Sequence, residues 1–92
     1  MKSILQTEKK CFVCGKTYDL AVHHVYEGTA NRRVSDATGM TIFLCHFHHN
    51  MSNEGIHFNK ELDLSVKRYA QEIYEREHTR EEFRSLFGKS WL

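Results

Sequence analysis

Residues 40–49 read MTIFLCHFHH, and this stretch decides how the chain folds. Its first half, MTIFL, is rich in β-branched and aromatic residues and predicts a short strand over residues 40–44. Its second half, CHFHH, begins at Cys45 and predicts a short helix that ends near residue 53 and is closed by Gly55. A strand therefore leads directly into a helix that carries one cysteine and three histidines.

A second cysteine pair lies upstream of this stretch. Residues 11–15, CFVCG, predict a knuckle whose glycine suits the tight turn that lets two thiolates reach one ion. Cys11 and Cys14 are separated by two residues, and Cys45 and His48 repeat that spacing 31 residues after Cys14. The two pairs predict a structural zinc site of the Cys3His type. The alternative is that Cys11 and Cys14 are buried thiols and that His48 lies on the surface.

The composition shows why a metal would be needed. The chain has 92 residues, of which 40% are hydrophobic, with three Cys, seven His and a net charge of +1. A domain of this size buries only about 60–65% of the surface of its unfolded chain, so its core is thin. An odd number of cysteines argues against a disulfide framework, and the high histidine content argues for metal. Because the net charge is close to zero, any attraction to nucleic acid must come from a local patch or a metal.

We expect a complete, cytoplasmic protein with no membrane partner. No apolar run approaches the about 18 residues of a membrane helix. Residues 1–10 also lack the apolar stretch of a signal peptide.

A tandem of histidines predicts a second site. Residues 19–26, DLAVHHVY, predict a strand that carries His23 and His24. Adjacent residues on a strand point to opposite faces, and adjacent residues on a helix diverge by about 100°. We therefore expect His49 and His23 to hold a second ion, while His48 faces the zinc and His24 stays uncoordinated beside the second ion. A neutral imidazole beside a metal-bound phosphate can take a proton from water.

The segment between the two strands is polar. Residues 27–39 predict a polar loop, with a helical turn after Asn31 as an alternative. Arg32 and Arg33 lie in this segment, and together with Lys16 they are candidates for contacts to nucleic-acid phosphates. The alternative is that these side chains belong to a solvated loop.

The last third of the chain predicts two helices. Residues 59–77 repeat apolar residues at three or four positions, with Asn59 as N-cap. Residues 79–82, TREE, predict a capping box that opens a shorter helix ending before Gly88, and we expect residues 91–92 to fold back onto the core. The apolar stripe of the first helix, which we expect in the core, is Leu62, Val66, Tyr69 and Ile73. Its polar side, which we expect to be solvated, contains Lys67, Arg68 and Arg76.

These motifs, taken in order, resemble the HNH nucleases, which are also called ββα-metal or His-Me finger enzymes. The resemblance is carried by the CFVCG knuckle, the HH strand, the strand that ends in LC and the helix that opens CHFHH. Small phage and prophage HNH-like proteins are similar in addition over segments such as residues 28–39, and the resemblance covers about residues 11–92. It implies an α+β fold, with a zinc-stapled, treble-clef-like ββα-metal core and two C-terminal helices.

The expected organisation is a single HNH-type domain over residues 1–92. Residues 1–8 are expected to be flexible, residues 11–57 to form the zinc knuckle and ββα-metal core, and residues 58–92 to form the helical part.

The resemblance also implies an activity. The family uses one divalent ion, such as Mg²⁺, Mn²⁺, Ni²⁺ or Zn²⁺, to contact the scissile phosphate and stabilise the leaving 3′ oxygen. By position, His23 matches the strand ligand, His24 the general base and His49 the first helix ligand. The implied function is hydrolysis of DNA phosphodiester bonds by an endonuclease with weak sequence preference, with a phage or host protein as a further partner.

Two positions depart from the family pattern. The usual second helix ligand falls at Asn53, but we favour His57, because imidazole is the stronger ligand for transition metals. Asn53 or water is the alternative. The family's central asparagine, which positions the strand histidine, falls at Met40, and either Thr41 or Asn31 would have to replace it. This second departure supports a rival interpretation, a catalytically weak or inactive zinc-stabilised adaptor of phage origin that binds DNA or protein.

Overall fold

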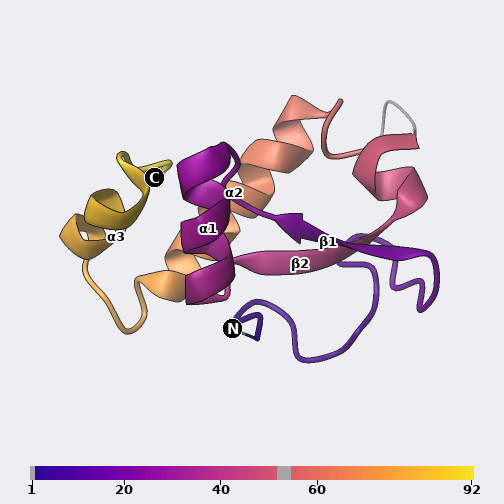
Figure 1. Ribbon diagram of the computed structural model, residues 1–92, viewed down its shortest axis with the longest axis horizontal. Helices are drawn as coiled ribbons and strands as arrows, with labels where there is room; N and C mark the ends of the chain where they lie inside the picture. Colours follow the sequence, from indigo (N-terminus) through magenta and orange to yellow (C-terminus); the bar gives the residue numbers. More distant parts are fainter. Residues whose placement is uncertain (1, 52–54) are drawn as a thin grey trace.

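The computed structural model describes residues 2–51 and 55–92. Within these residues the chain is an α+β domain, in which a two-stranded antiparallel sheet is accompanied by helices, as predicted (Figure 1). The elements in chain order are β1 (Leu20–His24), α1 (Thr29–Thr38), β2 (Thr41–Cys45), the π-helical turn η1 (Phe47–Met51), α2 (Lys60–Tyr74) and α3 (Arg80–Phe87). No helix in the described part of the chain is long and apolar enough to cross a membrane.

The strands β1 and β2 are joined through α1 and form an antiparallel pair, which we call the hairpin. This pair places the tandem histidines on different faces. His23 lies opposite Ile42 and His24 lies opposite Thr41 in the antiparallel register. Because side chains alternate along a strand, His23 points inward and is 3% exposed, whereas His24 is only partly buried. The predicted strands over residues 19–26 and 40–44 are therefore confirmed, with ends that differ by one or two residues.

The segment between the strands is a helix, so the predicted loop over residues 27–39 was wrong. The helix α1 ends at Thr38 and is capped by Gly39, whose φ of 78° is the left-handed conformation that favours glycine. Its anchor is the buried Ser35, whose hydroxyl donates to the carbonyl of Tyr26 at 3.1 Å and accepts from the N–H of Tyr26 at 3.3 Å. An apolar stripe is the usual signal of a packed helix. In α1 the buried residue is the polar Ser35, and Val34 packs beside it against the core.

Residues 2–12 run along the outer edge of β2. Ser3 donates its hydroxyl to the carbonyl of Thr41, and the side-chain oxygen of Gln6 accepts from the N–H of Phe43 at 2.7 Å. The N–H of Phe12 then donates to the carbonyl of Phe43 at 2.8 Å. These contacts satisfy edge groups that would otherwise be open to another strand. The predicted flexibility of residues 1–8 stays a prediction.

Both C-terminal helices begin as their caps predict. The side chain of Asn59 accepts from the N–H of Leu62 at the start of α2. At the start of α3, Thr79 and Glu82 form both hydrogen bonds of the predicted capping box. The helix α2 ends at Tyr74, three residues before the predicted end.

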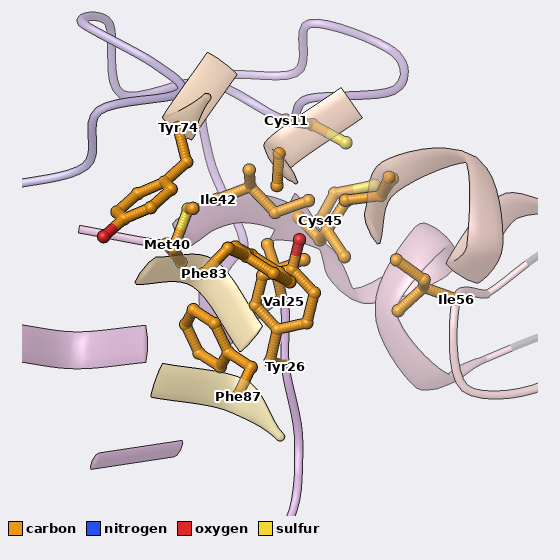
Figure 2. Packing of buried hydrophobic residues seen from close by; sticks show 13 residues of the cluster. Cys11, Val25, Tyr26, Met40, Ile42, Cys45, Ile56, Tyr74, Phe83 and Phe87 are labelled. Atoms are coloured by element: carbon orange, nitrogen blue, oxygen red, sulfur yellow. The ribbon is translucent and has the colours of Figure 1, made fainter. Parts of the chain in front are cut away.

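The core lies between the hairpin and the C-terminal helices, with Tyr26 near its centre (Figure 2). The ring of Tyr26 packs on Phe83, Phe87 and Trp91, with centroid distances of 5.3, 4.3 and 4.8 Å. Trp91 therefore folds back as predicted, and its backbone N–H donates to the side-chain oxygen of Gln71 at 2.8 Å. Leu92 is exposed, so that part of the prediction was wrong, because Trp91 already fills the space beside Tyr26.

Two positions of α2 differ from the predicted division into an apolar and a solvated side. Val66 is buried as expected, but Tyr69 is 40% exposed. Lys67, predicted to be solvated, is buried. Burial opposes the charged form of this lysine, but hydrogen bonds to the carboxylates of Asp63 and Glu27 outweigh burial and raise its pKa.

Candidate metal centres

The three cysteines and His48 converge at one end of the hairpin. Cys45 ends β2, His48 lies in η1, and the other two cysteines lie in the knuckle before β1. The ligand atoms of all four residues lie within 4.8 Å of one another. The Sγ atoms of Cys14 and Cys45 are 3.7 Å apart, close to the about 3.8 Å between two sulfurs on one tetrahedral zinc. The Nδ1 atom of His48 is 3.3 Å from the Sγ of Cys45 and 3.9 Å from that of Cys11. This cluster can bind a metal ion such as zinc.

The backbone of the knuckle prepares the Cys11 thiol for metal. The N–H of Gly15 donates to the carbonyl of Cys11 at 2.9 Å, and the φ of Gly15 is 79°. Burial alone would raise the pKa of the Cys11 thiol, but N–H groups of Cys45, Cys14 and Val13 lower it to about 6. Thiolate is the form that binds zinc, so the fold favours the ligand form of Cys11 at neutral pH.

A second cluster contains His23, His49 and His57. Their ligand nitrogens all lie within 4.8 Å of one another, and the Nε2 atoms of His49 and His57 are 3.0 Å apart. The ring of His23 meets the other two rings edge-on, with centroid distances of 5.5 and 5.3 Å. Two imidazole nitrogens on one ion at about 2.1 Å are about 3.0–3.4 Å apart. The three side chains are therefore close enough to share one ion.

The buried nitrogen of His23 supports a ligand role. Among the described residues, its Nε2 is the buried side-chain atom with no hydrogen-bond partner. Leaving such an atom unsatisfied costs about 1–3 kcal/mol, which a bound ion would offset. Burial, together with the smaller effects of the neighbouring His57 and His49, lowers the pKa of His23 to about 4. The imidazole is therefore neutral at cellular pH, as a metal ligand must be.

The chain returns to η1 after Gly55, and this explains how His57 reaches the cluster. The N–H of Ile56 donates to the carbonyl of His48 at 2.7 Å, and the N–H of His57 donates to that of His49 at 3.3 Å. The structure thus brings His57 beside His49, eight residues earlier in the chain. Asn53, the alternative ligand, lies outside the described residues.

A pocket of about 240 Å³ opens beside this second cluster. Two predicted residues outside the cluster, His24 and Arg32, line it. Arg33 does not, because neighbouring residues on α1 diverge by about 100°. The residues that line the pocket are Val22, His23, His24, Glu27, Arg32, His49 and His57.

Two other predicted site residues lie elsewhere, and the charged pocket residue Glu27 was missed. Asn31 does not line this pocket, and Lys16 pairs with Asp19 at 3.7 Å. Glu27 was not predicted, although it follows the HH strand closely. An isolated acidic residue in a polar segment gives no signal that separates it from a solvated side chain.

His24 has neighbours that differ from those the family pattern implies. Its Nε2 is 3.7 Å from the Oδ1 of Asp36, and Thr41 lies opposite it in the hairpin. Met40, at the position of the family's asparagine, is buried in the core. Thr41 rather than Asn31 is therefore the predicted substitute that lies next to His24.

The burial of His23 predicts a pH-dependent stability. When no second ion is bound, the free energy of unfolding should fall as pH drops from about 6.5 to 4. In this range the unfolded chain takes up a proton at His23 that the folded protein does not, since folding lowers its pKa to about 4. The expected loss is about 3 kcal/mol. Urea unfolding of the zinc-loaded protein across this range would measure it, with His23→Gln as control. Equal pH slopes for the two proteins would contradict the prediction.

No significant match to the chain was found among protein-family models, curated proteins or solved structures. The two clusters and the pocket beside the second one therefore carry the functional conclusion.

Proposed function

We propose that the protein is a metal-dependent endonuclease of the HNH type that hydrolyses DNA phosphodiester bonds in the cytoplasm. One observation carries the proposal. Three histidines that are close enough to share an ion line a pocket together with a fourth histidine outside the cluster and an arginine. A purely structural metal site has no need of an uncoordinated imidazole and a phosphate-binding group at its open side.

Each residue of the site would have a separate role in hydrolysis. An ion held by His23, His49 and His57 would supply Lewis-acid stabilisation of the phosphate and the leaving 3′ oxygen. His24 would take the proton of the attacking water. Asp36 would stabilise the imidazolium that forms, because its carboxylate lies 3.7 Å from the Nε2 of His24.

Arg32 is the residue of the pocket suited to hold a phosphate oxygen. Its guanidinium presents several donors and always carries a charge. Since the net charge of the chain is only +1, binding of DNA would depend on such local groups and on the ion. Phosphate contacts carry no sequence information, so we expect weak sequence preference.

A zinc-stabilised adaptor that binds DNA or protein without turnover is the second candidate. It is favoured by Met40, which fills the core at the position where the family carries an asparagine. Such an adaptor would need the Cys3His cluster and not the second ion.

The number of bound ions separates the two candidates. We expect the purified protein to hold one zinc tightly and one exchangeable ion, and to nick supercoiled plasmid only when the exchangeable ion is present. His57→Ala should weaken binding of the exchangeable ion by more than the about 10–100-fold that loss of an outer-shell partner costs, and leave the zinc content unchanged. Metal analysis after dialysis, combined with Mn²⁺ titration and a nicking assay, measures both. A protein with one zinc, no second ion and no nicking would support the adaptor instead.

A further inference from the structure

A buried lysine connects α2 to the pocket of the second cluster. Lys67 is 8% exposed, and its Nζ lies 2.8 Å from the Oε1 of Glu27 and 2.8 Å from the Oδ2 of Asp63. Taking such charges out of water costs several kcal/mol, and an apolar residue of similar volume is often as stable or more stable. Stability of the core therefore does not explain why a lysine occupies this position.

Glu27 is the partner of Lys67 that faces the histidines. It lines the pocket with His23 and His57, and its side chain is half exposed. A divalent ion on three neutral imidazoles would attract this carboxylate strongly. A glutamate that joined the three histidines would occupy a position on the ion that water or phosphate needs.

The structure shows Glu27 held outside the ligand group. Among the described residues, the ligand atoms within 4.8 Å of one another at this site belong to three histidines alone. The Glu27 carboxylate is instead hydrogen-bonded to Lys67. Asp63 fixes Lys67 from one turn earlier on α2, so the ammonium stays in place. The carbonyl of Lys67 also accepts a 2.6 Å hydrogen bond from the hydroxyl of Tyr26, the residue before Glu27.

We propose that Lys67 is a positioning residue that holds the Glu27 carboxylate away from the ion of the second cluster and so keeps a coordination position open. This inference rests on the proposed function, because an open position matters only where substrate binds. It assigns the two residues opposite effects, since Glu27 is a potential inhibitor of the site and Lys67 restrains it.

The affinity of the zinc-loaded protein for Mn²⁺ tests this proposal, with free ion counted by electron paramagnetic resonance. Lys67→Met should bind Mn²⁺ about ten-fold more tightly, because a charged ligand joins three neutral ones. The double variant Lys67→Met with Glu27→Gln should return to the wild-type affinity. A merely structural lysine would give looser binding or no change in Lys67→Met, and either result would overturn the proposal.

The other carboxylate provides a matched control. Lys67→Met with Asp63→Asn removes the second partner of the lysine but leaves Glu27 charged, so its Mn²⁺ affinity should stay as high as that of Lys67→Met. Return of this variant to the wild-type affinity would mean that Glu27 is not the cause, and the proposal would be wrong.

One further variant keeps the test decisive if Lys67→Met does not fold. Glu27→Gln alone changes a half-exposed side chain, and its Mn²⁺ affinity should match that of the wild type. A ten-fold loss of affinity would identify Glu27 as a ligand and overturn the proposal. These readouts do not depend on nicking, so a wild-type protein that binds Mn²⁺ without cleaving DNA would contradict the proposed function alone. A wild type that binds no second ion would overturn both.

Discussion

Replacing His24 with alanine is expected to lower the rate of plasmid nicking by about 10²–10⁴-fold. The side chain lines the pocket beside the second cluster but does not belong to its ligand group. It is therefore free to act as the general base, and its loss removes proton transfer while both metal clusters stay complete. The rate at saturating Mn²⁺, measured by conversion of supercoiled to open-circular plasmid, is the quantity to compare.

Metal binding distinguishes a lost base from a damaged site. His24→Ala should keep the wild-type zinc content and Mn²⁺ affinity. His46→Ala is the matched control, because His46 is an exposed histidine that lies in neither cluster. We expect that variant to nick plasmid at the wild-type rate. Equal loss of activity in both variants, or full activity in His24→Ala, would contradict the assigned role.

Residue spacing was sufficient to predict which side chains meet. Two pairs with the same two-residue gap predicted the Cys3His cluster. Both pairs can bind one tetrahedral ion because the knuckle turn lies beside the end of β2. The divergence of adjacent residues then separated His48 from His49. Both inferences depend on local geometry, which sequence order determines directly.

The features that escaped prediction depend on tertiary contacts between polar residues. The helix α1 is anchored by hydrogen bonds between the hydroxyl of Ser35 and the backbone of Tyr26, and a serine in a polar segment gives no sign that it will be buried. Lys67 was predicted to be solvated because it lies on the polar side of α2, and only the approach of Glu27 from the end of the hairpin allows its burial. Glu27 itself was missed for the same reason, since its meaning depends on a lysine 40 residues away.

Replacing each of the adjacent histidines of η1 with alanine should affect different properties. His48→Ala should lower the thermal stability, and His49→Ala should remove only the exchangeable ion. His48→Ala removes one of four ligands from the structural cluster, whereas His49→Ala removes one of three from the second cluster. Structural zinc contributes about 10–16 kcal/mol in small domains, so an equal share for each of four ligands is about 2.5–4 kcal/mol. For a domain of this size that loss lowers the melting temperature by about 10–30 °C.

The thin core makes this difference easy to observe. A domain with a net stability of about 5–15 kcal/mol does not survive full removal of the zinc, so a chelator that strips the Cys3His cluster should unfold the wild type. His49→Ala should keep its zinc, melt close to the wild type and lose only the exchangeable ion. Thermal unfolding followed by circular dichroism, with zinc content measured on the same samples, makes the comparison. Equal melting temperatures for the two variants would mean that His48 does not hold the structural ion. The assignment of His48 to the structural cluster and His49 to the second cluster would then be wrong.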